Sequence, residues 1–222
     1  MKFTIKLKLA LAFAFLLVLL LGTAGFGIRS LSSINDTMGA TIDGPVARLE
    51  LAQRINIAQL QGLRQQKNMI AASTPAEIQS AQQKSDAARA ELKQALDKAL
   101  AIASEQGRPR WLKIQELAAK ADTVDDKVRA LVISGAADQA QRLSITEARE
   151  VANELDAVVD ELIKLGKQQL DEADAAADTS YSTTSTIMIG VAAGAVLIGL
   201  VAAFWISLTI SRGLQRATNA VR

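Results

Sequence analysis

Two uninterrupted apolar segments lie near the two ends of the chain, and a long polar segment separates them. Residues 9–28 and residues 187–206 each run for twenty positions without a charged side chain. At about 1.5 Å per residue, a helix of this length spans about 30 Å, the thickness of the hydrocarbon core of a bilayer. The pattern therefore predicts two transmembrane helices.

Between these segments, apolar residues recur at alternating spacings of three and four, which is typical of helices packed through one face. This periodicity predicts four helices within residues 29–186. The expected core faces are Asn56, Leu60, Leu63, Lys67 and Ile70 in the first; Ile78, Ala81, Ser85, Ala88, Leu92, Ala95, Ala99 and Ile102 in the second; Ile114, Leu117, Ala121, Val124, Val128 and Leu131 in the third; and Ala148, Val151, Leu155, Val158, Leu162 and Leu165 in the fourth.

Residues that start or stop helices divide this middle segment. Residues 74–77, Thr-Pro-Ala-Glu, form a capping box with proline in the first turn, which predicts a helix start. Gly107 and Pro109 are expected to end the second helix, and Gly135 is expected to end the third helix. The pair Gly44-Pro45 predicts a local irregularity in the first helix. We expect the polar stretch 178–186 to stay helical, because backbone entering lipid must satisfy its own hydrogen bonds.

These patterns predict an all-α fold, an antiparallel up-down four-helix bundle flanked by two transmembrane helices. The first and fourth helices are the longest, and the second and third form a shorter return hairpin. The expected organisation is a cytoplasmic N-terminus at 1–8, a first transmembrane helix at 9–28, an extracytoplasmic sensor at 29–186, a second transmembrane helix at 187–206 and an incomplete linker at 207–222.

The charges indicate how the chain is oriented in its membrane. Three lysines lie in residues 1–28 and three arginines in residues 187–222, whereas all 23 acidic residues lie between. The positive-inside rule then places both termini in the cytoplasm and residues 29–186 outside a bacterial inner membrane, in the periplasm. A cleaved signal peptide is the alternative interpretation of the first apolar segment, with residues 22–24 as the cleavage site.

The composition narrows the chemistry that the chain can perform. Cysteine and histidine are absent, which removes disulfides, thiol chemistry and the most common general base and metal ligand. No glycine-rich phosphate loop, metal-ligand cluster or nucleophile–base pair occurs in the sequence. We therefore expect no catalytic residues, no cofactor, no metal and no nucleic-acid partner.

Two stretches resemble a known family. Residues 63–70, Leu-Arg-Gln-Gln-Lys-Asn-Met-Ile, followed by the capped turn at 74–78, are similar to the end of the first sensor helix in methyl-accepting chemotaxis proteins. Residues 207–222 resemble the entry into a HAMP linker, with Gly213 where the usual pattern has proline. The resemblance implies a transmembrane chemoreceptor that signals through HAMP to a cytoplasmic module controlling a histidine kinase.

A candidate ligand site follows from matching heights along the two longest helices. Lys67 lies 39 residues beyond Ile28, and Ala148 lies 39 residues before Ile187. In an antiparallel pair, Arg64, Lys67 and Asn68 should therefore lie near Thr146 and Arg149. Such a cluster of donors suits a carboxylate ligand, and the family resemblance, in which arginines of the first helix face the fourth, favours it. Alternatively, Lys67 sets helix register or extends its charge out to solvent.

Several functions remain open from the sequence. The leading hypothesis is a chemoreceptor that senses a small solute, directly or through a carrier protein. A sensor histidine kinase with the same sensor architecture is the second. A structural membrane bundle that binds no ligand is the third. We also expect a homodimer with the first helix nearest the two-fold axis, from the family resemblance and from apolar surface left on that helix.

Overall fold

The computed structural model describes residues 5–220, and within them the side chains except those at 5, 8, 209, 210 and 212–220. The predicted cytoplasmic terminus at 1–8 and linker at 207–222 thus lie partly outside the described residues. The elements are α1 (Ile5–Thr41), the π-helix η1 (Ile42–Val46), α2 (Ala47–Ala71), α3 (Pro75–Ala101), α4 (Arg108–Ile133), α5 (Ala137–Leu143), the π-helix η2 (Ser144–Ala148) and α6 (Arg149–Ala220).

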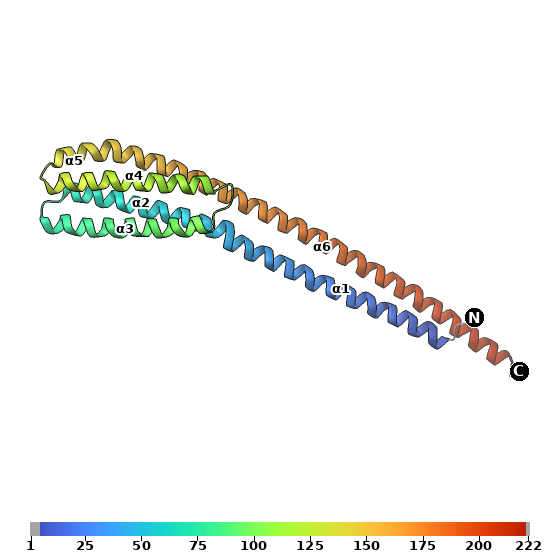
Figure 1. Ribbon diagram of the computed structural model, residues 1–222. Helices are drawn as coiled ribbons and strands as arrows, with labels where there is room; N and C mark the ends of the chain where they lie inside the picture. Colours follow the sequence, from blue (N-terminus) through green and yellow to red (C-terminus); the bar gives the residue numbers. More distant parts are fainter. Residues whose placement is uncertain (1–4, 221–222) are drawn as a thin grey trace. The chain divides into compact units, whose positions relative to one another are not determined.

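Residues 39–173 form one compact unit, an antiparallel bundle of four helical columns. The columns are α2, α3, α4 and the run from α5 through η2 into α6, which lie side by side in Figure 1. The loops at 72–74 and 134–136 are three residues long. Short connections of this kind join antiparallel neighbours, so the predicted up-down four-helix fold is confirmed.

The second unit contains α1 up to Met38 and α6 from Asp174 onward. Ser30 Oγ and Thr184 Oγ1 share a hydrogen bond of 2.9 Å, and Gly27 faces Met188. Both helices are long and apolar enough to cross a membrane by length and composition, with mean hydropathy of 2.5 and 2.6 in their most apolar segments. Their large apolar side chains are exposed, as lipid-facing side chains would be.

Local chemistry explains most helix boundaries. Thr74 Oγ1 accepts from the Glu77 amide, and the Glu77 carboxylate accepts from the Thr74 amide, which confirms the predicted capping box. Pro45 lies inside η1, so the predicted irregularity is also confirmed. Proline lacks the amide that a regular helical turn would use, and the wider π-turn accommodates this. Gly135 has φ +79° just after α4, a conformation that favours glycine.

Two boundaries differ from the sequence prediction. The second helix ends at Ala101, six residues before Gly107, and Pro109 lies in the first turn of α4. Proline fits there because the first helical amides have no partner within the helix. The fourth column was expected to be one regular helix, but the π-turn η2 interrupts it before α6. From Arg149 onward α6 is unbroken through the polar stretch, as predicted.

The predicted core faces are correct in α3, α4 and α6 except near their ends. The face predicted for α2, the first helix of the bundle, is wrong, because the buried positions lie one residue earlier in the sequence. Leu60 and Lys67 are exposed, whereas Ile55, Gln59, Gln66 and Met69 are buried. The physical reason is that this core face carries glutamines that hydrogen-bond across the bundle, while Leu60 and Ile57 remain on the outer surface. A prediction that puts apolar residues in the core therefore chooses the neighbouring face of α2, which carries Leu60, instead of the buried face with the glutamines.

Candidate ligand-binding site

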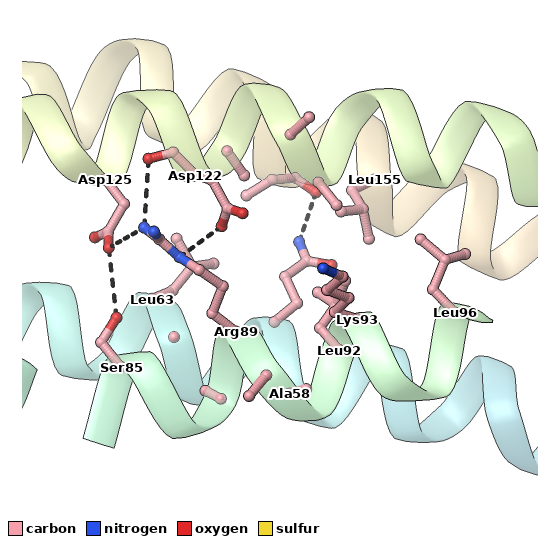
Figure 2. A pocket seen from close by; sticks show the side chains of 18 of the residues that line it. Ala58, Leu63, Ser85, Arg89, Leu92, Lys93, Leu96, Asp122, Asp125 and Leu155 are labelled. Carbon is pink, nitrogen blue, oxygen red and sulfur yellow. Dashed lines mark hydrogen bonds and ion pairs between the residues drawn. The ribbon is translucent and has the colours of Figure 1, made fainter. Parts of the chain in front are cut away.

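A pocket of about 550 Å³ interrupts the core of the bundle, and all four columns contribute to its wall. This volume lies in the range of small-molecule sites in proteins. Figure 2 shows side chains that line it. The lining residues are Ala58, Gln59, Gly62, Leu63 and Gln66; Ser85, Asp86, Ala88, Arg89, Ala90, Leu92, Lys93, Leu96 and Asp97; Gln115, Ala118, Ala119, Ala121, Asp122 and Asp125; and Ala148, Ala152 and Leu155.

The pocket lies between two separate apolar clusters. One cluster, around Ile55, Trp111 and Leu155, fills the core on one side. The other, around Met69 and Val128, fills it on the other side. Between them many inward positions carry glycine or alanine, including Gly62, Ala88, Ala121, Ala148 and Ala152. The larger side chains of the two apolar clusters keep the helices apart on both sides of this level. The small side chains between the clusters do not fill the gap, so a pocket remains.

A network of polar side chains crosses one part of the pocket and joins all four columns. Its centre is Asp125 of α4, whose carboxylate accepts from Gln66 of α2 at 3.0 Å and from Ser85 of α3 at 3.4 Å. Arg129 donates to the same carboxylate at 2.7 Å. Ser144 Oγ of η2 donates to the side-chain oxygen Oε1 of Gln66 at 2.9 Å. Each buried polar group named here thus has a partner, as buried groups require.

Arg89 bridges three carboxylates beside this network. Its guanidinium contacts Asp122 at 2.8 Å, Asp125 at 3.1 Å and Asp126 at 2.9 Å. Figure 2 shows Arg89 and Asp122 extended toward each other across the gap between α3 and α4. Burial raises the pKa of Asp122, Arg89 opposes this, and the charges of Asp126 and Asp125 add to the rise. The Asp122 carboxylate therefore carries negative charge that its surroundings only partly compensate.

A second polar feature lies on the α2 wall. The Gln59 amide donates to the Ala152 carbonyl oxygen at 3.0 Å, while Gln59 Oε1 is buried and has no hydrogen-bond donor in the part of the chain that the structure describes. Asp156 lies one turn further along α6. Burial, followed by the charge of Asp160, raises its pKa, and a hydrogen bond from Gln59 offsets only part of this rise. Gln59 Oε1 is thus closed off from the pocket space as well as from solvent, so it is not offered to a ligand there.

Among the residues that the structure describes, no three carboxylates converge as metal ligands would. The four carboxylates nearest the pocket network, Asp86, Asp122, Asp125 and Asp126, are instead held by Arg89 and Arg129. The arrangement suits an organic ligand, because it combines an apolar wall with a few fixed polar groups.

The residues predicted from the sequence as ligand contacts do not line this pocket. Arg64, Lys67, Asn68, Thr146 and Arg149 are all exposed. Thr146 Oγ1 donates to the Arg142 carbonyl oxygen, and Asn68 donates to Gln65, so both bond within their own column. The prediction that Lys67 lies on an apolar seam is wrong, because the core face of α2 is one position away.

The height matching behind that prediction was off by about one helical turn. Gln66 bonds to Ser144, and Gln59 bonds to Ala152, so Lys67 lies nearer the level of Leu143 than of Ala148. The sequence prediction missed Gln59, Gln66, Arg89, Asp122 and Asp125. A signal was present in the seams of small residues at Ala88 and Ala121 and in the polar Ser85 among them, which together indicate a core that is not filled.

Comparison with known proteins adds a family assignment to this geometry. Residues 2–181 match the model of a family described as a four helix bundle sensory module for signal transduction. The chain belongs to this family. Searches of curated proteins and of solved structures gave no match. The sensory module therefore has a pocket in the core of its bundle.

Proposed function

We propose that this sensory module is the front part of a chemoreceptor that binds a small solute outside the cytoplasmic membrane. The observation that carries the proposal is the pocket, which opens the core of a sensory bundle where a purely structural bundle would be filled. The apolar and polar groups on its wall are those of a small-molecule site.

The proposed signal travels along α6. Ala152 and Leu155 of this helix form part of the pocket wall, and the helix continues without a break to Ala220, beyond the apolar segment 187–206. A ligand that changes how α6 packs in the bundle would act on a helix that is continuous from the pocket to the apolar segment. Helix shifts of about 1–2 Å are a common form of such signals.

The proposed orientation has both termini in the cytoplasm and the bundle in the periplasm of a bacterial inner membrane. Lys2, Lys6 and Lys8 precede the first apolar segment, and Arg212, Arg216 and Arg222 follow the second. A reporter enzyme that is active only in the periplasm, fused after Arg222, should be inactive. Activity of that fusion would refute the two-span topology.

The proposed assembly is a homodimer with the first sensor helix nearest the two-fold axis. Ile57 and Leu60 support it, because both are large apolar side chains exposed on the outer face of α2. Exposed apolar surface of this kind favours a partner. Cysteines introduced one at a time along residues 31–49 should cross-link between copies in membranes. Cross-linking confined to cysteines placed in α3 and α4 would contradict this arrangement.

The proposed output is control of a chemotaxis kinase through a HAMP linker that residues 207–222 begin. A sensor histidine kinase is the second candidate, because it uses the same kind of front part. Fusing the chain at Arg222 to the HAMP and kinase-control module of a chemoreceptor should give cells that respond to the bound solute. A hybrid that binds solute but gives no response would favour the other output.

The central experiment screens solutes against the full chain in lipid nanodiscs. A ligand at about 100 times its Kd raises the free energy of unfolding by about 2.7 kcal/mol, which a thermal-shift assay detects. Ala121→Leu places a larger side chain in the pocket and should abolish the shift. Ala130→Leu, on the exposed face of α4, is the matched control and should retain it. Stabilisation that survives Ala121→Leu would place the site elsewhere, and the absence of any stabilising solute would favour a structural bundle.

A further inference from the structure

The polar side chains around the pocket carry an excess of negative charge. Arg89 and Arg129 are the two cations of the network, and they face four carboxylates, those of Asp86, Asp122, Asp125 and Asp126. Two further charged residues on the wall, Lys93 and Asp97, cancel each other. Two arginines are thus shared among four carboxylates, and the formal charge of this cluster is −2.

The hydrogen-bonding capacity on the wall is unbalanced in the same direction. The Asp122 carboxylate meets Arg89 through Oδ1, and its second oxygen, Oδ2, has no partner among the described residues, while 46% of the side chain is exposed. Arg89 is bonded to Asp122 through Nε, and to Asp125 and Asp126 through one of its two terminal nitrogens, Nη2. The pocket therefore offers acceptors, and a ligand that supplies donors would complement it.

The rest of the wall is apolar. Leu63, Leu92, Leu96 and Leu155 line the pocket together with alanines from every column. Figure 2 shows Leu63 beside Arg89, with Leu92, Leu155 and Leu96 further along the pocket. Burial of a hydrocarbon body against these side chains would supply affinity in proportion to the area removed from water. The polar groups would then fix the orientation of the ligand.

We propose that the pocket binds an organic cation, with a protonated amine or guanidinium at Asp122 and an apolar body against the leucines. This inference rests on the proposed function and adds the chemical class of the solute. It differs from the carboxylate predicted from the sequence for the exposed residues around Arg64 and Arg149. The carboxylate stays a prediction, and it is one outcome of the test.

The test measures binding of three probes with the same phenylethyl skeleton to the full chain in nanodiscs by calorimetry, with empty nanodiscs subtracted. The probes are 2-phenylethylamine, the neutral 2-phenylethanol and the anionic 3-phenylpropanoate. We expect the amine to bind at least tenfold more tightly than the alcohol, and the anion more weakly still, because one charge-assisted hydrogen bond separates the first two.

A pair of variants locates the charge. Asp122→Asn removes the charge on the pocket wall but keeps a hydrogen-bonding side chain, and it should weaken binding of the amine about tenfold or more. Asp126→Asn removes a charge from the same Arg89 cluster but does not line the pocket, so binding should stay within about twofold. Equal losses in the two variants would overturn the assignment to Asp122.

The other outcomes separate this inference from the proposed function. If the alcohol or the anion binds as tightly as the amine, and Ala121→Leu abolishes that binding, the pocket is a ligand site but the cation assignment is wrong. If none of the three probes binds, the cation assignment fails, because a pocket of this volume admits all three. The wider solute screen then decides the proposed function independently.

Discussion

Replacement of Asp125 by alanine tests whether the polar network holds the four columns of the bundle together. The Asp125 carboxylate accepts from Gln66, Ser85, Arg89 and Arg129, which belong to three different helices. Only 14% of its side chain is exposed. Asp125→Ala removes the one acceptor that these donors share, whereas removal of any single donor would leave the others bonded.

The size of the effect follows from what each donor retains. Arg89 keeps Asp122 and Asp126, and Arg129 keeps Asp86, so neither cation is left without a carboxylate. Gln66 is 3% exposed, and its amide loses its acceptor inside the bundle. An unsatisfied buried donor costs about 1–3 kcal/mol, and a lost hydrogen bond to a charged group about 1.5–3 kcal/mol. Asp125→Ala should therefore lower the free energy of unfolding by about 3–5 kcal/mol.

Asp126→Ala is the matched control, because it removes a carboxylate from the same cluster at a site that is 62% exposed. Exposed ion pairs contribute about 0–1 kcal/mol. Urea unfolding can be followed by the fluorescence of the buried Trp111 in a Trp205→Phe background. Equal destabilisation by the two variants, or less than about 1 kcal/mol for Asp125→Ala, would refute the central role of Asp125.

Three further predictions concern other parts of the bundle. Thr74→Ala removes the side-chain half of the capping box of α3 and should lower the free energy of unfolding by about 1 kcal/mol in the same assay. Lys67→Ala should change it by less than about 0.5 kcal/mol, because Lys67 is exposed and lies off the core; a larger gain would instead support the seam predicted from the sequence. Burial raises the pKa of Asp122 and of Asp156, so the folded state takes up protons before the unfolded state, and stability should rise as the pH falls from 7 toward about 5. Asp122→Asn with Asp156→Asn should flatten this dependence, which urea titrations across that pH range would measure. Below about pH 4 the trend should reverse, because backbone hydrogen bonds from Ser73 and Thr74 lower the pKa of Glu77 and stabilise its ionised form.

The sequence by itself determined the features that depend on neighbouring residues. The capping box at Thr74, the turn at Gly135, the irregularity at Pro45 and the unbroken course of α6 each follow from local backbone chemistry. The two apolar segments follow from composition over twenty residues. Helix periodicity was also sufficient for α3, α4 and α6, since their core faces are apolar or contain small residues.

Only the tertiary structure decided which side chains meet. The core face of α2 carries Gln59 and Gln66, and burying a glutamine side chain is costly unless its amide finds a hydrogen-bond partner, which for these two lies on another helix. Those partners, Ala152 and Asp125, lie about 60 to 90 residues away in the chain, so no local pattern identifies them. The pocket has the same origin. It exists because small side chains on four columns coincide at one level of the bundle, and that coincidence depends on how the columns are aligned along their axes.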